Sequence, residues 1–150
     1  MGGFGAALLL ATLTTQAQLK PEDQIKYRQA GYSFMAWNMG KIKAQVVDGS
    51  VPYKKEQVVA AANAIAAIAN SGMGSLFAPG TGMDKMGDKT RLKPEFFQNL
   101  DEANKLARNF TTAVNKLASE AASGDQARIK TAFGEVGKTC KACHDQFRAD

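Results

Sequence analysis

The chain has 150 residues, of which 45% are hydrophobic, 8% aromatic and 22% charged. This length suits one domain with a single core, and the composition excludes an intrinsically disordered protein. The formal net charge is +5, but the basic residues are interspersed with acids, which argues against a nucleic-acid-binding protein. Alanine is abundant and there are only four prolines, so the composition favours helices over strands.

The N-terminal segment carries no charge between residues 2 and 18. An apolar run from Phe4 to Leu13 is followed by Thr15-Gln16-Ala17, with small residues at the outer positions. This pattern predicts a secretory signal peptide over residues 1–17 and export to the periplasm, although no basic residue stands near the start. The run is too short to span a bilayer, and the alternative is an apolar turn docking on the domain of residues 18–150.

Two helical segments follow. The first begins at Lys20-Pro21-Glu22-Asp23, with proline at the favoured first position and acids in the first turn, and it ends at Asp48-Gly49-Ser50. Its apolar stripe has helical spacing and consists of Ile25, Tyr32, Met35, Met39, Ile42 and Val46. The second segment begins near Pro52 and ends at Asn70-Ser71-Gly72. A glycine-rich stretch from Ser71 to Lys93 then predicts a long loop, which is usually functional or mobile.

Two further helical segments complete the chain. The third begins at Pro94 and ends at Ser123-Gly124-Asp125, where Gly124 is expected to cap it and Asp125 to open the next helix. The fourth runs to the end with an apolar side formed by Ile129, Phe133, Val136, Cys140, Cys143 and Phe147. No segment alternates with period two. We therefore predict an all-α fold, an antiparallel up-down-up-down four-helix bundle.

The last predicted helix contains Cys140-Lys141-Ala142-Cys143-His144, which uses both cysteines and the only histidine. This is the C-x-x-C-H signature of covalent haem attachment, in which two thiols join the haem and the imidazole binds its iron. A thioredoxin-like pair belongs at a helix N-terminus, a zinc site needs a further ligand, and a structural disulfide leaves His144 unexplained. The sequence therefore predicts one covalently bound haem c per chain.

A haem motif at the end of a helical chain resembles the cytochrome c′ family, the class II c-type cytochromes. The resemblance covers residues from about Lys20 to Asp150. It rests on the helix start with Tyr27-Arg28-Gln29, on Phe77-Ala78-Pro79-Gly80-Thr81 in the long loop, and on Ala132-Phe133-Gly134-Glu135-Val136-Gly137 leading into the haem motif. The resemblance implies the bundle fold and a haem held within it.

The resemblance also implies the roles of residues on the proximal side. Cys140 and Cys143 would anchor the haem as thioethers, and His144 would be the axial iron ligand. Arg148 would lie beside the proximal face, for which an exposed arginine at a helix C-terminus is the alternative.

On the opposite side, the resemblance places Arg28 and Gln29 at the haem propionates, and Arg can meet a carboxylate with two bonds. Tyr32 would stand over the open iron face without ligating it, and Met35 and Phe77 would complete the distal pocket wall. The alternative for Arg28 and Gln29 is a solvated pair, and for the other three residues it is ordinary core packing.

An iron with one histidine and a crowded apolar far side would be five-coordinate and high-spin. The resemblance implies that it binds nitric oxide, and carbon monoxide more weakly, or transfers electrons in the periplasm. We expect no enzymatic activity, because the chain lacks a second histidine and a convergent pair of acids. The alternatives are a low-spin electron carrier with Met35 or Met39 as sixth ligand, and a haem-free helical module. A Tyr32 phenolate ligand would need a strongly lowered pKa.

The resemblance further implies a homodimer that pairs through the first two helices, near Gln24, Lys43 and Val47. We expect neither a membrane nor a nucleic-acid partner. The sequence does not identify a redox partner.

Overall fold

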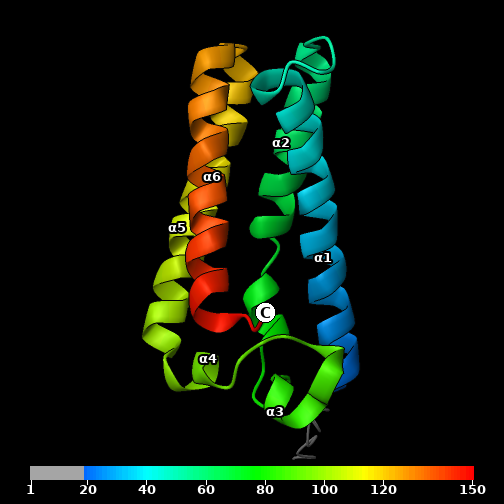
Figure 1. Ribbon diagram of the computed structural model, residues 1–150, viewed down its shortest axis with the longest axis vertical. Coiled ribbons are helices and arrows are strands. Elements are labelled where there is room, and N and C mark those ends of the chain that lie inside the picture. The colour runs from blue at the N-terminus through cyan, green and yellow to red at the C-terminus, as the bar shows by residue number, and fades with distance from the viewer. Residues whose placement is uncertain (1–18) are drawn as a thin grey trace, which may run out of the picture.

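The computed structural model describes residues 19–150, so the signal peptide predicted over residues 1–17 lies outside the described residues. Figure 1 shows four long helices side by side, each running opposite to the one before it. They are α1 (Pro21–Ile42), α2 (Lys55–Ala69), α5 (Leu100–Ser123) and α6 (Gln126–Phe147). This arrangement confirms the predicted antiparallel up-down-up-down four-helix bundle.

Shorter elements lie between the long helices. The π-helical turn η1 (Lys43–Val47) extends α1. The segment predicted as a long loop contains three short helices, which are η2 (Met73–Leu76), α3 (Met83–Met86) and η3 (Gly87–Lys89). Figure 1 places α3 and α4 (Glu95–Gln98) at the end of the bundle that holds the start of α1 and the end of α6. The bundle is therefore closed at this end by irregular structure.

The third predicted helix is broken at Asn99, which corrects the prediction of one helix from Pro94 onwards. The backbone of Asn99 has φ −128° and ψ 48°, and α4 and α5 lie on either side of it. Its side-chain Nδ2 donates a hydrogen bond of 2.9 Å to the Glu95 carbonyl. A side chain that bonds to its own backbone competes with the helical ladder in this way.

The turn between α5 and α6 is formed as predicted. Gly124 has φ 80°, a left-handed conformation that favours glycine, and it ends α5. The Asp125 side chain accepts hydrogen bonds from the backbone N–H groups of Ala127 (3.0 Å) and Arg128 (3.1 Å). It therefore satisfies two donors that the first turn of α6 leaves free.

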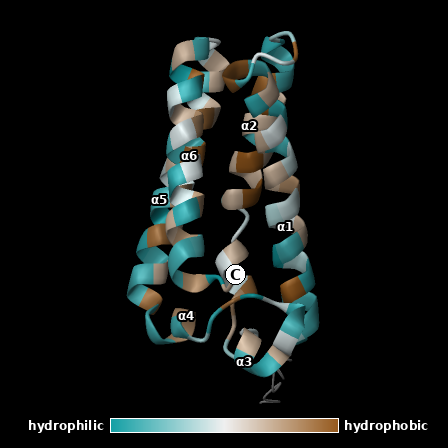
Figure 2. Ribbon diagram, in the orientation of Figure 1, coloured by the Kyte–Doolittle hydropathy of each residue, from teal (hydrophilic) through white to brown (hydrophobic). Residues whose placement is uncertain are grey.

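The hydrophobic core lies between the four long helices, and Figure 2 shows hydrophobic bands on α2 in the middle of the bundle. Its fully buried members include Ile42, Val58, Ile65, Val114, Leu117, Ile129 and Val136. The helices pack in the order α1 on α2, α2 on α5 and α5 on α6, and α6 also meets η1. By contrast, α1 and α6 make few direct contacts. Within residues 19–150, no helix is both long and apolar enough to cross a bilayer.

Candidate haem site

The haem motif lies near the C-terminal end of α6, on the side that faces the core. Cys140 and Cys143 are both free thiols and both half-buried, and Cys140 packs against the hydrophobic core. Burial raises the pKa of each thiol. His144 is exposed, one residue after Cys143. On a helix these spacings bring the two thiols and the imidazole to one face, as the haem motif requires.

Tyr32 of α1 faces the motif from across the bundle. Its pKa is raised to about 12, mainly because protein atoms desolvate the hydroxyl and further because of the nearby Cys143 and Cys140 thiols. Nevertheless, 44% of the residue is exposed. This exposed fraction shows that Tyr32 is not a buried core residue. Its place over the iron stays a prediction.

Arg28, one helical turn before Tyr32, is a buried cation with only 3% of its surface exposed. Nη1 donates to the Leu76 carbonyl (3.1 Å) and to Thr81 Oγ1 (2.7 Å). Nη2 donates to the Thr81 carbonyl (2.7 Å) and to Thr90 Oγ1 (2.9 Å). The guanidinium carbon also lies 4.8 Å from the centre of the Phe77 ring. Arg28 thus fastens α1 to the segment that follows α2.

All these hydrogen-bond acceptors are neutral, and no ion pair to Arg28 occurs among residues 19–150. Desolvation lowers the pKa of the guanidinium, although the Tyr32 hydroxyl opposes this effect. Burying a cation without a counter-charge is costly. A haem propionate would provide that negative charge, so this unpaired arginine fits the predicted cofactor. The propionate would have to share or replace the acceptors that Arg28 now uses.

Gln29 is exposed, and its Nε2 donates to the Lys89 carbonyl (2.9 Å) rather than pointing into the bundle. Gln24 is 4% exposed, donates to the Leu19 carbonyl and accepts from the Ala78 N–H. Gln24 itself therefore exposes little surface to a second copy. The dimer contact near Gln24, Lys43 and Val47 stays a prediction.

Arg148 lies beside His144, with its Nη1 3.5 Å from His144 Nδ1, and its place beside the proximal haem face stays a prediction. Arginine can only donate, so a hydrogen bond here needs a His144 tautomer whose Nδ1 carries no proton. A histidine that binds iron through Nε2 carries its proton on Nδ1, which would leave the two groups in contact without a bond. The backbone of Arg148 forms an antiparallel bridge with Leu92, which fixes the end of α6.

Phe77 and Met35 have different surroundings. Phe77 is half-buried and its ring lies edge-on to Tyr32, with centroids 6.4 Å apart. Met35 is 4% exposed and lies in the hydrophobic core cluster with Ile42 and Ile65. Met39 packs against that cluster and is partly buried.

The structure adds site residues that the sequence did not indicate. Thr81 and Thr90 are buried and receive the Arg28 guanidinium, and Phe96 stacks on Phe77 with centroids 5.1 Å apart. Thr81 ends the Phe77–Thr81 block of the family resemblance but had no role assigned to it, and Thr90 lies in no motif. A buried arginine requires hydrogen-bond acceptors, so knowing that Arg28 is buried would have indicated that such residues exist. The sequence does not show that burial.

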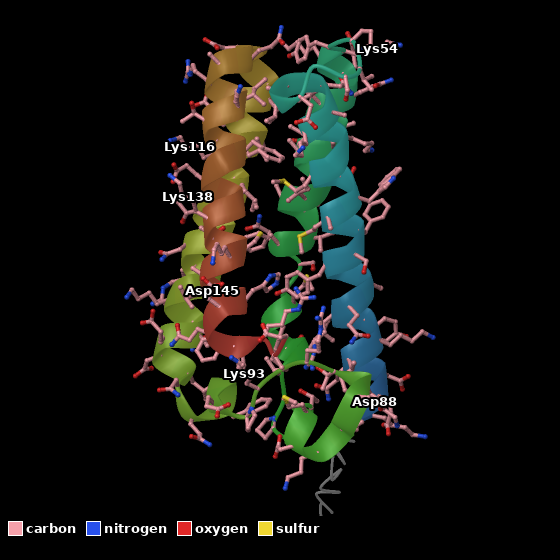
Figure 3. All side chains as sticks on the ribbon, in the orientation of Figure 1. Lys54, Asp88, Lys93, Lys116, Lys138 and Asp145 are labelled. Atoms are coloured by element: carbon pink, nitrogen blue, oxygen red, sulfur yellow. The ribbon has the colours of Figure 1, made fainter. Side chains whose placement is uncertain are left out.

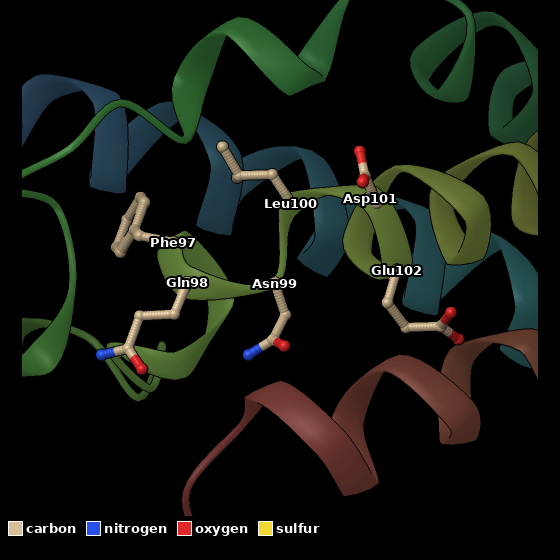
Figure 4. Close-up of a pocket in the computed structure, with 6 residues that line it drawn as sticks. All are labelled: Phe97, Gln98, Asn99, Leu100, Asp101 and Glu102. Carbon is tan, nitrogen blue, oxygen red and sulfur yellow. The ribbon is translucent and has the colours of Figure 1, made fainter.

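A surface hollow of about 480 Å³ lies where α4 meets α5, lined by Phe97, Gln98, Asn99, Leu100, Asp101 and Glu102 (Figure 4). None of the predicted site residues lines it. The hollow lies at the break at Asn99, and its lining residues are distant in sequence from the haem motif.

The comparisons agree with this geometry. A family model described as Cytochrome C′ matches residues 23–148. The cytochrome c′ of Allochromatium vinosum is 57% identical over 143 residues, which are 95% of this chain and 91% of that protein. A cytochrome c′ structure described as having a ligand-controlled dimer dissociation is 58% identical, with a TM-score of 0.83 over 89% of this chain and all of that one.

More distant structures are those of variants of cytochrome c′ from Alcaligenes xylosoxidans, solved with nitric oxide and with carbon monoxide. Each is 33% identical, with a TM-score of 0.77 over 87% of this chain and 98% of that one. The matched family model spans most of the chain, and the haem motif stands at its expected place in the bundle. The chain therefore belongs to the cytochrome c′ family, whose members carry covalently attached haem c.

Proposed function

We propose that this protein binds small uncharged diatomic ligands, nitric oxide above all and carbon monoxide more weakly, at a five-coordinate high-spin haem iron. When bound, the haem supplies an iron centre that can take up such a ligand or change its oxidation state. In this proposal Cys140 and Cys143 hold the haem, and His144 is its axial ligand. Tyr32 covers the opposite face, with Phe77 beside it.

The observation that carries this proposal is the position of Tyr32. Its side chain is desolvated by protein and senses the Cys143 and Cys140 thiols, yet 44% of the residue is open to water. These observations support a position of Tyr32 opposite the haem-attachment residues. A pKa of about 12 keeps the phenol neutral at physiological pH when no iron is bound to it. A neutral phenol over the iron blocks the sixth position and can be displaced.

The competing proposal is a low-spin electron carrier with Met35 or Met39 as sixth ligand. Met35 is buried in the core cluster, where its side chain contributes to helix packing. To reach an iron opposite Tyr32 it would have to leave that cluster, which would create a cavity there. The related structures with nitric oxide and carbon monoxide also support an iron with an available position.

The test is carbon monoxide binding to the ferrous protein and to Tyr32→Ala. We expect Tyr32→Ala to bind carbon monoxide at least about tenfold more tightly than the parent. The ligand no longer has to break the contacts of the Tyr32 ring, and about 1.4 kcal/mol of such contacts corresponds to tenfold in affinity. Leu100→Ala, at an exposed apolar residue of α5 outside the predicted site, is the control and should bind as the parent does. Equal affinity of Tyr32→Ala and the parent protein would contradict the placement of Tyr32 over the iron.

We propose that the protein acts in the periplasm, in nitric oxide binding or electron transfer and not as an enzyme. The uncharged apolar run from Phe4 to Leu13 supports export, as does the haem motif, which is typical of proteins matured outside the cytoplasm. The signal peptide predicts a mature N-terminus at Gln18, and an intact mass showing residues 1–17 retained in the exported protein would contradict that cleavage.

We also propose that a second copy of the chain covers the outer side of α1. Tyr27, Phe34 and Trp37 are 53%, 50% and 58% exposed at helical spacing, and the Phe34 and Trp37 rings are in contact at 5.3 Å. The Lys41 ammonium lies 3.9 Å from the centre of the Trp37 ring. The related cytochrome c′ described as a dissociating dimer supports a second copy as the occupant.

Sedimentation tests this homodimer. Phe34→Ser combined with Trp37→Ser should shift the protein to the monomer at micromolar concentration, because the change removes two large apolar rings from the contact. Leu100→Ser, an equally exposed apolar residue on α5, should leave the sedimentation unchanged. A dimer that persists in the double variant would contradict this surface.

A further inference from the structure

The geometry points to Phe96 as a positioning residue that limits how far Tyr32 can move and so sets the affinity for a distal gas ligand. This inference rests on the proposed function, in which Tyr32 stands over the iron. Phe96 belongs to α4, contacts no predicted haem-binding group except Phe77, and lies outside every motif of the sequence. Its role would be exerted through Phe77.

The aromatic rings form a continuous series of contacts from Tyr32 to the end of α6. The Tyr32 ring meets Phe77 edge-on at 6.4 Å, and Phe77 is stacked on Phe96 at 5.1 Å with an interplanar angle of 27°. Phe96 in turn meets Phe147 edge-on at 5.4 Å. These distances lie within the range of favourable aromatic pairs. The series links α1, the segment after α2, α4 and α6.

The far end of the series is fixed. Phe147 is 2% exposed, and its carbonyl accepts a hydrogen bond from the Lys93 N–H at 2.9 Å. The Ala149 N–H donates to the Arg91 carbonyl at 2.9 Å, on the other side of the Leu92–Arg148 bridge. Phe147 is therefore a buried ring on a backbone that these hydrogen bonds hold in place. Figure 1 shows α4 beside this end of α6.

Phe96 is held by the same segment, since its N–H donates to the Lys93 carbonyl at 3.1 Å. It also contacts Phe97 edge-on at 5.3 Å. Phe77, next in the series, is held by Phe96 and by the Arg28 guanidinium at 4.8 Å. Protein interiors are close-packed, so a ring pressed against fixed neighbours has little free space to enter.

These contacts have a consequence for ligand entry. A ligand that takes the sixth iron position must push the Tyr32 ring away, and one direction of retreat is blocked by Phe77. Phe77 can give way only if Phe96 yields. A smaller or more flexible side chain at Phe96 would therefore lower the cost of displacing Tyr32. It would do so without touching the haem, its thioether anchors or His144.

The experiment measures carbon monoxide affinity of the ferrous haem-loaded protein in a double-mutant cycle of Phe96→Leu and Tyr32→Ala. We expect Phe96→Leu alone to tighten binding by about two- to tenfold, the equivalent of one aromatic pair. In the Tyr32→Ala background the same change should have no effect, because nothing remains to be displaced. Phe96→Met serves as a second variant that keeps more of the side-chain volume. Phe133→Leu, a half-buried phenylalanine of α6, is the control and should leave the affinity unchanged.

The outcomes separate the inference from the proposed function. If Tyr32→Ala tightens binding but Phe96→Leu and Phe96→Met do not, Phe96 has no positioning role while Tyr32 keeps its own. If Phe96→Leu acts equally with and without Tyr32, it works through the fold or the proximal side, and the inference is overturned. If Tyr32→Ala itself changes nothing, the proposed function fails and the inference falls with it.

Discussion

Arg28 makes the strongest polar attachment between α1 and the segment after α2, so replacing it should destabilise the protein markedly. We consider Arg28→Met, which keeps the aliphatic stem and removes the guanidinium. The change leaves three buried acceptors without this donor, on Thr81 Oγ1, the Thr81 carbonyl and Thr90 Oγ1, and one partly buried acceptor on Leu76.

At about 1 kcal/mol for each acceptor, the loss is about 3–4 kcal/mol of the free energy of unfolding. Denaturant unfolding of the haem-loaded protein, followed by helical circular dichroism, measures the difference. Arg108→Met replaces an exposed arginine of α5 and should change stability by less than about 0.5 kcal/mol. A loss below about 1 kcal/mol for Arg28→Met would refute the reasoning that its four bonds hold the segment.

Three further predictions concern the bundle and the distal residue. Leu117→Ala, in the fully buried core, should cost about 2–5 kcal/mol in denaturant unfolding, and a cost below 1 would mean that the core repacks freely. Asp125→Ala removes the acceptor at the start of α6 and should cost about 1 kcal/mol, whereas Gln126→Ala at the next position should be nearly neutral. Tyr32 should remain a neutral phenol up to pH 10 and ionise near its folded pKa of about 12. The Tyr32 hydroxyl loses its proton at lower pH in the unfolded chain than in the folded protein. The contribution of Tyr32 to stability is therefore constant below about pH 10 and falls between about pH 10 and 12. The measurement is the phenolate absorbance of the parent protein compared with that of Tyr32→Phe. A phenolate signal that appears below pH 10 in the parent and is missing in Tyr32→Phe would contradict this prediction.

The fold could be predicted because the residues that begin and end its helices act locally. Pro21 begins a helix by its own geometry, and Gly124 with Asp125 ends one helix and starts the next. The break at Asn99 escaped prediction because the apolar spacing continues through it. The break is visible only in the structure, from the Asn99 backbone angles and from the hydrogen bond that its side chain donates to the Glu95 carbonyl.

The candidate site could be predicted only where a motif is contiguous. Cys140, Cys143 and His144 lie within one turn of helix, so their spacing alone indicates the chemistry. Tyr32 has the spacing of a core residue, and its partial exposure depends on how few contacts α1 makes with α6. That is a property of the assembled bundle.

The partners of Arg28 and Phe77 could not be predicted, because they come from separate parts of the chain. Thr81 and Thr90 reach Arg28 from more than fifty residues away, and Phe96 reaches Phe77 from another helix. Figure 3 shows the labelled side chains of Asp88 and Lys93 at this same end of the bundle, with Lys54 at the opposite end. Folding thus brings the segment that supplies these contacts beside the C-terminal end of α6.

The central claim is that His144 is the only protein ligand of the iron and that the face under Tyr32 is available. It is tested most directly by absorption and electron paramagnetic resonance spectra of the haem-loaded protein, before and after nitric oxide is added to the ferrous form. We predict a high-spin spectrum that changes on addition of nitric oxide. A low-spin spectrum with a methionine–iron charge-transfer band, unchanged by nitric oxide, would contradict the account.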